Sequence, residues 1–367
     1  MRGIALPPEA SRAAREGVRS YYQYRPPAAD AHPQLPAFLA ASLSRGSVLP
    51  AAAPAAILRS PARRRPTATG GTSVELLRSL LFVPGHRERM LARAATAGAD
   101  AIVIDLEDAV PRAEKKAARR QARAALKALA GVGQTVFVRV NSIDSGLTSD
   151  DLMALVRKGL AGVVLPKAAH PQDLRDLDVL LREAEMAHKV RPGDIRTIPL
   201  IESPRALLRC EEIARASDRI VALSVGGEDY SAAMGIARDA GGVGLAHLRY
   251  VVATVAAAYG LLAIDTPYAG IRDAKGLAAE TRLVKAIGFK GKYVLHPDQV
   301  AAVNRAFTPS REEIVAARRT VAAAHEGLTQ GAGAISLDGR MVDAPVVERA
   351  TRLLATAAAI KSRTTKE

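Results

Sequence analysis

The sequence is poor in the residues that build disulfides, base-stacking surfaces and membrane spans. Its 367 residues include one cysteine, Cys210, no tryptophan and 4% aromatic residues. A single cysteine forms no intramolecular disulfide, which favours a reducing compartment and gives Cys210 a packing role. Few aromatic rings leave few platforms for stacked bases, and no apolar run approaches the ~20 residues of a membrane span. We therefore expect a cytoplasmic protein with no nucleic-acid or membrane partner.

Positive charge is abundant but uneven along the chain. The formal net charge is +15, and residues 1–70 hold ten arginines and three acids, a net of +7. The remaining 297 residues carry +8, with basic and acidic residues interleaved along helical stretches such as RAEKKAARRQARAALKALA. A mildly basic body of this kind suits an anionic metabolite, which its field would attract.

Residues 1–74 differ from the rest of the chain. They are rich in Ala, Pro, Ser and Arg, and their apolar residues follow no sustained period. Such a composition buries little surface, so we expect a disordered or loosely attached extension. An organelle transit peptide has the same Arg-rich, acid-poor character, which would place the protein in an organelle matrix. A misassigned start codon would also give an N-terminal segment of this composition.

A regular alternation of short apolar runs and helical patterns begins near Val74. Continuous apolar strands that alternate with helices indicate a parallel sheet covered by helices, and eight units predict a (β/α)8 TIM barrel over residues 75–308. An open doubly wound sheet is the alternative, but no G-x-G-x-x-G motif follows the first strand. The expected strands are 79–85, 101–108, 135–141, 162–168, 197–203, 219–229, 261–268 and 292–298.

The chain continues beyond the eighth unit. Residues 309–367 contain a helical pattern at about 310–326, the dipeptide Asp338-Gly339 between two short apolar runs, and a final helical pattern. An Asp-Gly pair in that setting predicts a β-hairpin. We expect a C-terminal hairpin-and-helix extension, which a barrel alone does not require.

Polar residues cluster where the predicted strands end. Function in such barrels gathers at the carboxyl ends of the strands, where side chains from distant parts of the sequence converge. The candidates, in strand order, are Arg87 and Arg89; Asp105, Glu107 and Asp108; Arg139 and Asn141; Lys167; Glu202; Glu228 and Asp229; Asp265; and His296.

Several carboxylates without a Cys or His cluster indicate a hard cation. Mg²⁺ takes one or two carboxylates directly and completes its octahedron with water and substrate oxygens. Glu202 and Asp229, on neighbouring strands, are the natural direct pair. The fork of Arg139 suits a carboxylate or a thioester oxygen, and a metal with an arginine would stabilise an enolate.

Some of these residues also have a purely structural interpretation. Asp108 could cap the helix that begins near Pro111, and Arg139 could serve an ion pair. Lys167 could form an imine, although neighbouring carboxylates would hold it protonated. His296, before a proline, suits a turn, and Asp343, at a helix start, suits an N-cap.

The motifs closely resemble those of the citrate lyase β-subunit family, within the HpcH/HpaI aldolase superfamily. They are RSLLFVPG, GADAIVIDLEDAVP, VFVRVN, GVVLPK, IPLIES, GGEDY, YVLHPDQV and LDGRMVDAPVV, in that order over residues 76–357. The resemblance implies a Mg²⁺-dependent carbon–carbon lyase on a TIM barrel. It would cleave or form a 3-hydroxy-carboxyacyl-CoA such as citramalyl-, malyl-, β-methylmalyl- or citryl-CoA.

The resemblance also assigns roles to residues. Glu202 and Asp229 become the metal ligands, Arg139 binds the substrate, and Arg87 and Arg89 meet the phosphates of CoA. The acids Asp105, Glu107 and Asp108 stand near the water shell of the metal. Small departures from the family pattern occur, such as IES in place of IET at residues 201–203.

The family's general acid/base corresponds to Asp343. In the family it lies on a C-terminal element that covers the site of a neighbouring subunit, which implies a homotrimer or hexamer. An acyl-carrier partner would be needed if the chain served a citrate lyase complex. Two other functions stay open: a malate-synthase-like condensation or thioesterase, and a non-catalytic CoA-binding subunit.

Overall fold

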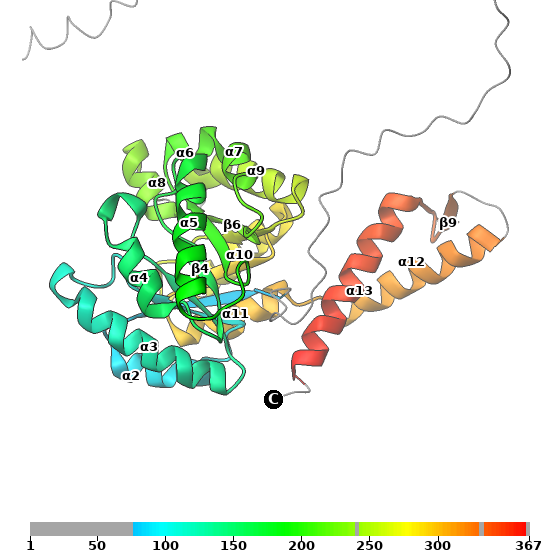
Figure 1. The fold of residues 1–367 in the computed structure, drawn as a ribbon. Coiled ribbons are helices and arrows are strands. Elements are labelled where there is room, and N and C mark those ends of the chain that lie inside the picture. The colour runs from blue at the N-terminus through cyan, green and yellow to red at the C-terminus, as the bar shows by residue number, and fades with distance from the viewer. Residues whose placement is uncertain (1–75, 239–241, 330–333, 365–367) are drawn as a thin grey trace, which may run out of the picture. The chain divides into compact units, whose positions relative to one another are not determined.

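Eight parallel strands form a closed barrel in which each strand pairs with the next and β8 pairs with β1. The computed structural model describes residues 76–238, 242–329 and 334–364, so the prediction for residues 1–74 lies outside the described residues. The predicted TIM barrel is confirmed (Figure 1). Its strands are β1 Ser79–Pro84, β2 Ala101–Asp105, β3 Thr135–Arg139, β4 Leu160–Leu165, β5 Arg196–Ile201, β6 Ala222–Val225, β7 Leu262–Asp265 and β8 Gly291–Val294.

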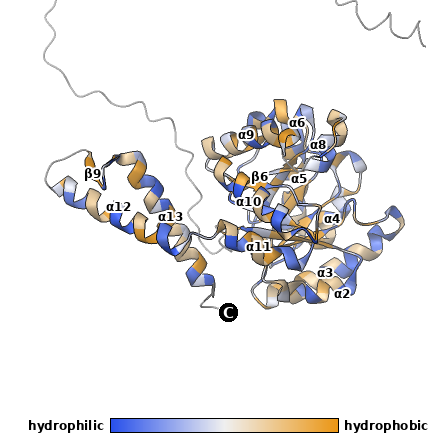
Figure 2. Ribbon diagram, turned by 180° about the vertical axis from the view of Figure 1, so that it is seen from behind, coloured by the Kyte–Doolittle hydropathy of each residue, from blue (hydrophilic) through white to orange (hydrophobic). Residues whose placement is uncertain are grey.

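Helices follow the strands and cover the outside of the barrel. Their amphipathic sequences alternate apolar and polar residues, as the orange and blue stretches in Figure 2 show. They are α2 Glu88–Arg93, α3 Lys115–Gly131, α4 Thr148–Leu155, α5 Pro171–Ala187, α6 Pro204–Leu208, α7 Cys210–Ala214, α8 Gly227–Met234, α9 Val243–Ala258, α10 Ala274–Ile287 and α11 Pro297–Phe307, with 3₁₀ turns at Ala94–Ala97, Arg112–Glu114 and Ile143–Ser145.

The apolar residues form two buried clusters, one on each face of the sheet. The smaller cluster fills the barrel interior and includes Leu80, Phe137, Ile198 and Tyr293. The larger one lies between the strands and the helices. It contains Cys210, which is free and buried, and burial raises the pKa of its thiol to about 12. The packing role predicted for this cysteine is confirmed.

The C-terminal segment has the predicted elements. Helix α12 (Arg311–Thr329) packs against α13 (Ala344–Thr364), and the antiparallel strands β9 (Ile335–Leu337) and β10 (Arg340–Val342) lie between them in the sequence (Figure 1). Asp338 and Gly339 have φ of 50° and 75°, the left-handed values that a two-residue hairpin turn requires. Within the described ranges, no helix is long and apolar enough to cross a membrane.

The observed strands stop earlier than the sequence pattern indicates. β2 ends at Asp105, so Glu107 and Asp108 lie in the following loop, and Glu228 and Asp229 belong to the first turn of α8. The barrel register places Asp105 opposite Arg139, and Ile201 opposite Val225. The candidate side chains therefore share one rim of the barrel, at the carboxyl ends of the strands.

Candidate active site

The carboxylate of Asp105 holds the loop after β2 and Arg139 together. Its Oδ1 accepts a hydrogen bond from the backbone N–H of Glu107 at 2.9 Å, and its Oδ2 accepts one from Ala109 at 3.2 Å. The same oxygens accept from Nε and Nη2 of Arg139, each at 2.7 Å. Because Asp105 is buried, this two-point bond fixes the plane of the guanidinium.

Arg139 is nearly surrounded by acids and one aromatic ring. Its Nη1 lies 3.0 Å from Oε2 of Glu107 and 3.9 Å from Asp108, and its guanidinium lies 4.9 Å from the centre of the Phe82 ring. Burial alone would lower the pKa of Arg139, but the hydrogen bonds and charge of Asp105, with the other two acids, raise it. Arg139 is thus a permanent, oriented cation. The ion-pair interpretation holds for this chain, and the guanidinium edge at Nη1 faces the acids at the rim.

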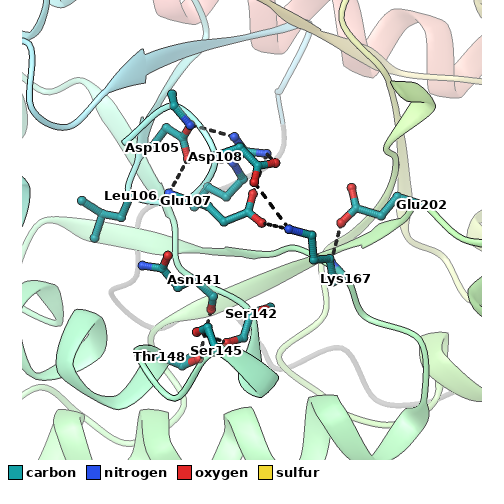
Figure 3. Close-up of polar contacts among 12 residues, drawn as sticks. Asp105, Leu106, Glu107, Asp108, Asn141, Ser142, Ser145, Thr148, Lys167 and Glu202 are labelled. Carbon is teal, nitrogen blue, oxygen red and sulfur yellow. Dashed lines mark hydrogen bonds and ion pairs between the residues drawn. The ribbon is translucent and has the colours of Figure 1, made fainter. Parts of the chain in front are cut away.

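Glu107 lies between two cations. Its Oε1 accepts from Nζ of Lys167 at 2.5 Å (Figure 3). Its Oε2 lies 3.0 Å from Nη1 of Arg139. The side chain is buried, and burial raises its pKa although the charges of Arg139 and Lys167 oppose this. Glu107 thereby connects the arginine of β3 with the lysine that follows β4.

Asp108 is no helix cap. The helical segment after β2 begins at Arg112 with Pro111 as its N-cap, and no side chain makes a capping hydrogen bond there. The Asp108 carboxylate is half exposed and lies 3.4 Å from Nζ of Lys167. Burial acts to raise its pKa, but Arg139 and Lys167 lower it below the usual range.

Lys167 contacts acids that follow two different strands, Glu202 after β5 and Glu107 and Asp108 after β2. Its backbone N–H donates to Oε1 of Glu202, and its side chain bonds Glu107 and Asp108 (Figure 3). Burial acts to lower the pKa of Lys167, but those two carboxylates raise it above its ordinary value. The ammonium stays protonated, which makes Lys167 unsuited to imine formation, as expected.

Glu202 is a buried carboxylate with little to neutralise it. It follows β5 directly and packs against Gly226, where any added Cβ would collide with its side chain. Burial, together with the charge of Asp229, raises the pKa of Glu202 to about 8. Asp229 makes no hydrogen bond or ion pair to another described residue, whereas Glu228 is bound by Arg238 at 2.7 Å. The GGEDY segment thus sends only its second acid toward Glu202.

An open pocket of about 280 Å³ adjoins Glu107 and Asp108, between the loops that follow β2, β3 and β4. Ser142, Ser145 and Thr148 bind one another there: the hydroxyls of Ser145 and Thr148 donate to the Ser142 carbonyl at 2.5 and 2.8 Å (Figure 3). The pocket is lined by Glu107, Asp108, Val110, Arg112, Lys115, Asn141, Ser142, Ser145 and Lys167.

Two supporting residues were missed by the sequence interpretation. Lys115 donates from Nζ to the carbonyl oxygens of Leu106 and Glu107 at 2.6 and 2.7 Å. These bonds hold the acidic loop, the segment after β2 that carries Glu107 and Asp108. Asp151, fully buried, accepts from the backbone and side chain of Asn141 at 2.8 and 2.6 Å. Lys115 stands at the start of a helix shortly after the acids, a weak signal, and no pattern singles out Asp151.

Three of the predicted site residues make no hydrogen bond or ion pair with the acidic cluster, which consists of Asp105, Glu107, Asp108, Arg139, Lys167, Glu202 and Asp229. Arg87 and Arg89 are exposed around the start of α2, after β1, and neither side chain bonds another described residue. Asp343 accepts from the backbone N–H of Val346 at 3.3 Å, so within one chain it caps α13.

Two other polar residues at strand ends have structural roles. Asp265 is fully buried behind the sheet, where Arg249 and Lys292 bind it at 2.9 and 2.5 Å. His296 accepts from the backbone N–H of Asp298 at 3.2 Å and caps α11, in agreement with its predicted turn role. Neither belongs to the acidic cluster.

The chemistry of the cluster fits a hard divalent cation. Its donors are carboxylate oxygens, and burial together with the charge of Asp229 opposes ionisation of Glu202, an effect that a bound cation would offset. Among the described residues, no three His, Cys, Asp or Glu side chains gather closely enough to enclose a metal ion. Mg²⁺ needs only one or two protein carboxylates and completes its coordination with water and substrate oxygens.

Residues 78–297 match the model of the HpcH/HpaI aldolase/citrate lyase family. Among curated proteins, the citrate lyase subunit beta of Leuconostoc mesenteroides is 36% identical over 279 residues, 76% of this chain and 92% of that protein. The human mitochondrial citramalyl-CoA lyase is 32% identical over 297 residues, 78% of this chain and 87% of that protein.

A solved structure gives the same result. Protein CitE from Mycobacterium tuberculosis, in complex with magnesium, acetoacetate and coenzyme A, is 33% identical with a TM-score of 0.62, and the match covers 76% of this chain and 97% of that one. The family model matches more than half of the chain, and both curated relatives are more than 30% identical to it. The chain therefore belongs to the HpcH/HpaI aldolase/citrate lyase family of lyases.

Proposed function

We propose that the protein is a Mg²⁺-dependent carbon–carbon lyase that acts on a 3-hydroxy-carboxyacyl-CoA thioester. The observation that supports this most is the pair of interacting acids Glu202 and Asp229 at the rim that also holds the oriented cation Arg139. The related CitE protein, with magnesium, acetoacetate and coenzyme A bound, supports the same class of ligands.

Glu202 and Asp229 would hold the metal, and Glu107 and Asp108 would face its water shell with Asp105 behind them. When bound, Mg²⁺ supplies positive charge next to the substrate oxygens. Arg139, which Asp105 holds in a fixed orientation, would bind the substrate's carboxylate and carbonyl oxygens. Arg87 and Arg89, exposed and unpaired among the described residues, would meet the phosphates of CoA.

Cleavage would proceed by transfer of two protons. A base takes the proton of the 3-hydroxyl, the hydroxyl carbon becomes the carbonyl of a 2-oxo acid or glyoxylate, and the electrons of the Cα–Cβ bond pass to the thioester enolate. Arg139 stabilises the oxygens while negative charge grows there. Asp343 then donates a proton to the enolate carbon, which yields the acyl-CoA product.

Asp343 would act on the site of a neighbouring subunit. Within the chain it caps α13 and contacts none of the cluster residues, so its catalytic role requires a second copy. We propose an obligate homotrimer or hexamer, with residues 75–308 as the catalytic domain and 309–367 as the element that completes a neighbour's site. The single cysteine favours a cytoplasmic or organelle-matrix setting. An acyl-carrier partner is part of this proposal only if the protein serves a lyase complex.

A panel of thioesters tests the function. Malyl-, citramalyl-, β-methylmalyl- and citryl-CoA are incubated with the protein, with and without Mg²⁺, and the acyl-CoA and oxo-acid products are quantified. We expect Mg²⁺-dependent cleavage of at least one. Release of free CoA from acetyl-CoA plus glyoxylate would instead indicate a malate-synthase-like enzyme. CoA binding without turnover or Mg²⁺ dependence would indicate a binding subunit.

A further inference from the structure

Lys167 has a backbone conformation that its residue type disfavours. Three non-glycine residues in the described ranges have positive φ: Lys167 and Lys189 at 55°, and Asp338 at 50°. Asp338 occupies the hairpin turn that needs this value. Lys189 follows the end of α5, where its N–H and that of Val190 donate to the carbonyls of Met186 and Glu185 at 3.3 and 2.9 Å. That pair of bonds is the usual left-handed ending of a helix.

No helix end or hairpin accounts for Lys167. It follows Pro166 in the turn after β4. A turn with proline at its second position and positive φ at its third normally has glycine or asparagine at that third position. A lysine there costs folding free energy relative to glycine. Non-glycine residues held in this region tend to occur at functional sites, which directs attention to the side chain.

Both ends of Lys167 bind acids of the candidate site. Its backbone N–H donates to Glu202 after β5, which glycine could do equally well. Its ammonium lies 2.5 Å from Oε1 of Glu107 and 3.4 Å from Asp108, both after β2. Only a long cationic side chain provides this second contact. The other oxygen of Glu107 lies 3.0 Å from Nη1 of Arg139.

We propose that the Lys167 ammonium is a positioning group for the reaction. It holds the Glu107 carboxylate against Arg139. It thereby fixes the spacing between Arg139, at the end of β3, and the carboxylate of Glu202, which follows β5. The effect on the reaction rate that this inference predicts rests on the proposed lyase function. The geometric part concerns this chain alone, so the two can fail separately.

The test compares substitutions that keep the backbone and remove the ammonium. Lys167→Gly and Lys167→Asn both tolerate positive φ, and each keeps the N–H that Glu202 accepts. Lys167→Arg keeps a cation. Lys189→Gly is the matched control, because Lys189 has the same φ, its side chain is exposed, and it makes no side-chain hydrogen bond or ion pair with a described residue.

We expect Lys167→Gly and Lys167→Asn to fold with a melting temperature near that of the wild type. Their kcat should fall about 10- to 100-fold, the usual effect of losing an outer residue that orients the groups around a metal site. KM for the thioester should stay within about threefold, because ground-state binding is unchanged. Lys167→Arg should recover part of kcat, and Lys189→Gly should leave it unchanged.

A crystal structure of Lys167→Gly supplies a readout that does not need turnover. We expect the Glu107 carboxylate to turn away from Nη1 of Arg139. The inference is overturned if Glu107 keeps its position, if Lys167→Gly retains wild-type kcat, or if KM rises while kcat does not fall. Absence of turnover by the wild type with all four thioesters would count against the proposed function, and the crystal structure would still decide the role of Lys167.

Discussion

At the scale of single residues, the site depends on a few buried charges, each with a defined partner. Asp105 is the clearest, since it binds Arg139 through two oxygens and accepts two loop amides. Sequence reasoning placed Asp105, Glu107, Arg139, Glu202 and Asp229 at one rim, because strand ends in a parallel barrel converge. It could not show that Asp105 serves Arg139, because that pairing depends on strand register.

Asp105→Ala should be strongly destabilising. It leaves Arg139 buried without its bidentate partner, which we expect to lower the free energy of unfolding by about 3–5 kcal/mol. Urea denaturation measures the change. The control Glu348→Ala breaks the exposed Glu348–Arg352 pair and should cost about 0.3–0.5 kcal/mol. Equal losses for the two variants would contradict the buried role of Asp105.

Mg²⁺ binding should depend on pH through Glu202. The pKa of this acid is raised from 4.5 to about 8, so below pH 8 the metal-free protein holds a proton that Mg²⁺ must displace. The apparent affinity should therefore fall by about tenfold per pH unit below 8, with release of about one proton. Calorimetry in buffers of different ionisation enthalpy measures both. An affinity that is constant from pH 6 to 8 would refute this.

At the scale of secondary-structure elements, the loops place the acids. The sequence pattern predicted every strand, the hairpin and the last helix, because apolar periodicity is local. It did not predict that Gly226 leaves room for Glu202, that Lys115 holds the acidic loop, or that Asp151 holds Asn141. These contacts join segments that are distant or lack a motif, so only the folded chain reveals them.

Gly226→Ala should disturb the metal site more than the fold. The added Cβ would collide with the carboxyl group and Cβ of Glu202, which forces that side chain to move. We expect Mg²⁺ affinity to fall by about 10- to 100-fold, measured by titration calorimetry. Gly131→Ala is the control: its Cβ would meet nothing within 4 Å, and it should stabilise the protein by about 0.4–1 kcal/mol. Unchanged Mg²⁺ affinity in Gly226→Ala would show that Glu202 does not bind the metal.

At the scale of the whole molecule, a single copy of the chain contains the barrel rim with its acids, but its Asp343 caps its own α13. If a neighbour supplies this acid, two inactive variants should complement each other. Co-refolding Asp343→Asn with Glu202→Gln combines an intact metal site from one chain with an intact Asp343 from the other. Random mixing should restore about a quarter of wild-type activity, measured by thioester cleavage.

The two variants assayed separately serve as controls and should stay inactive. If the mixed oligomers also stay inactive, although mass spectrometry shows that subunits have exchanged, Asp343 does not act on a neighbour's site.

The pairing of Asp105 with Arg139 across β2 and β3 also bears on how the barrel assembles. Because side chains alternate between the faces of a strand, a slip of one residue between β2 and β3 would leave the aspartate inside the sheet without its arginine. The misaligned barrel would contain two isolated buried charges, which is costly. The contact that orients Arg139 for its proposed role thus also favours the correct strand alignment during folding. Accurate assembly and the proposed chemistry therefore depend on the same pair of residues.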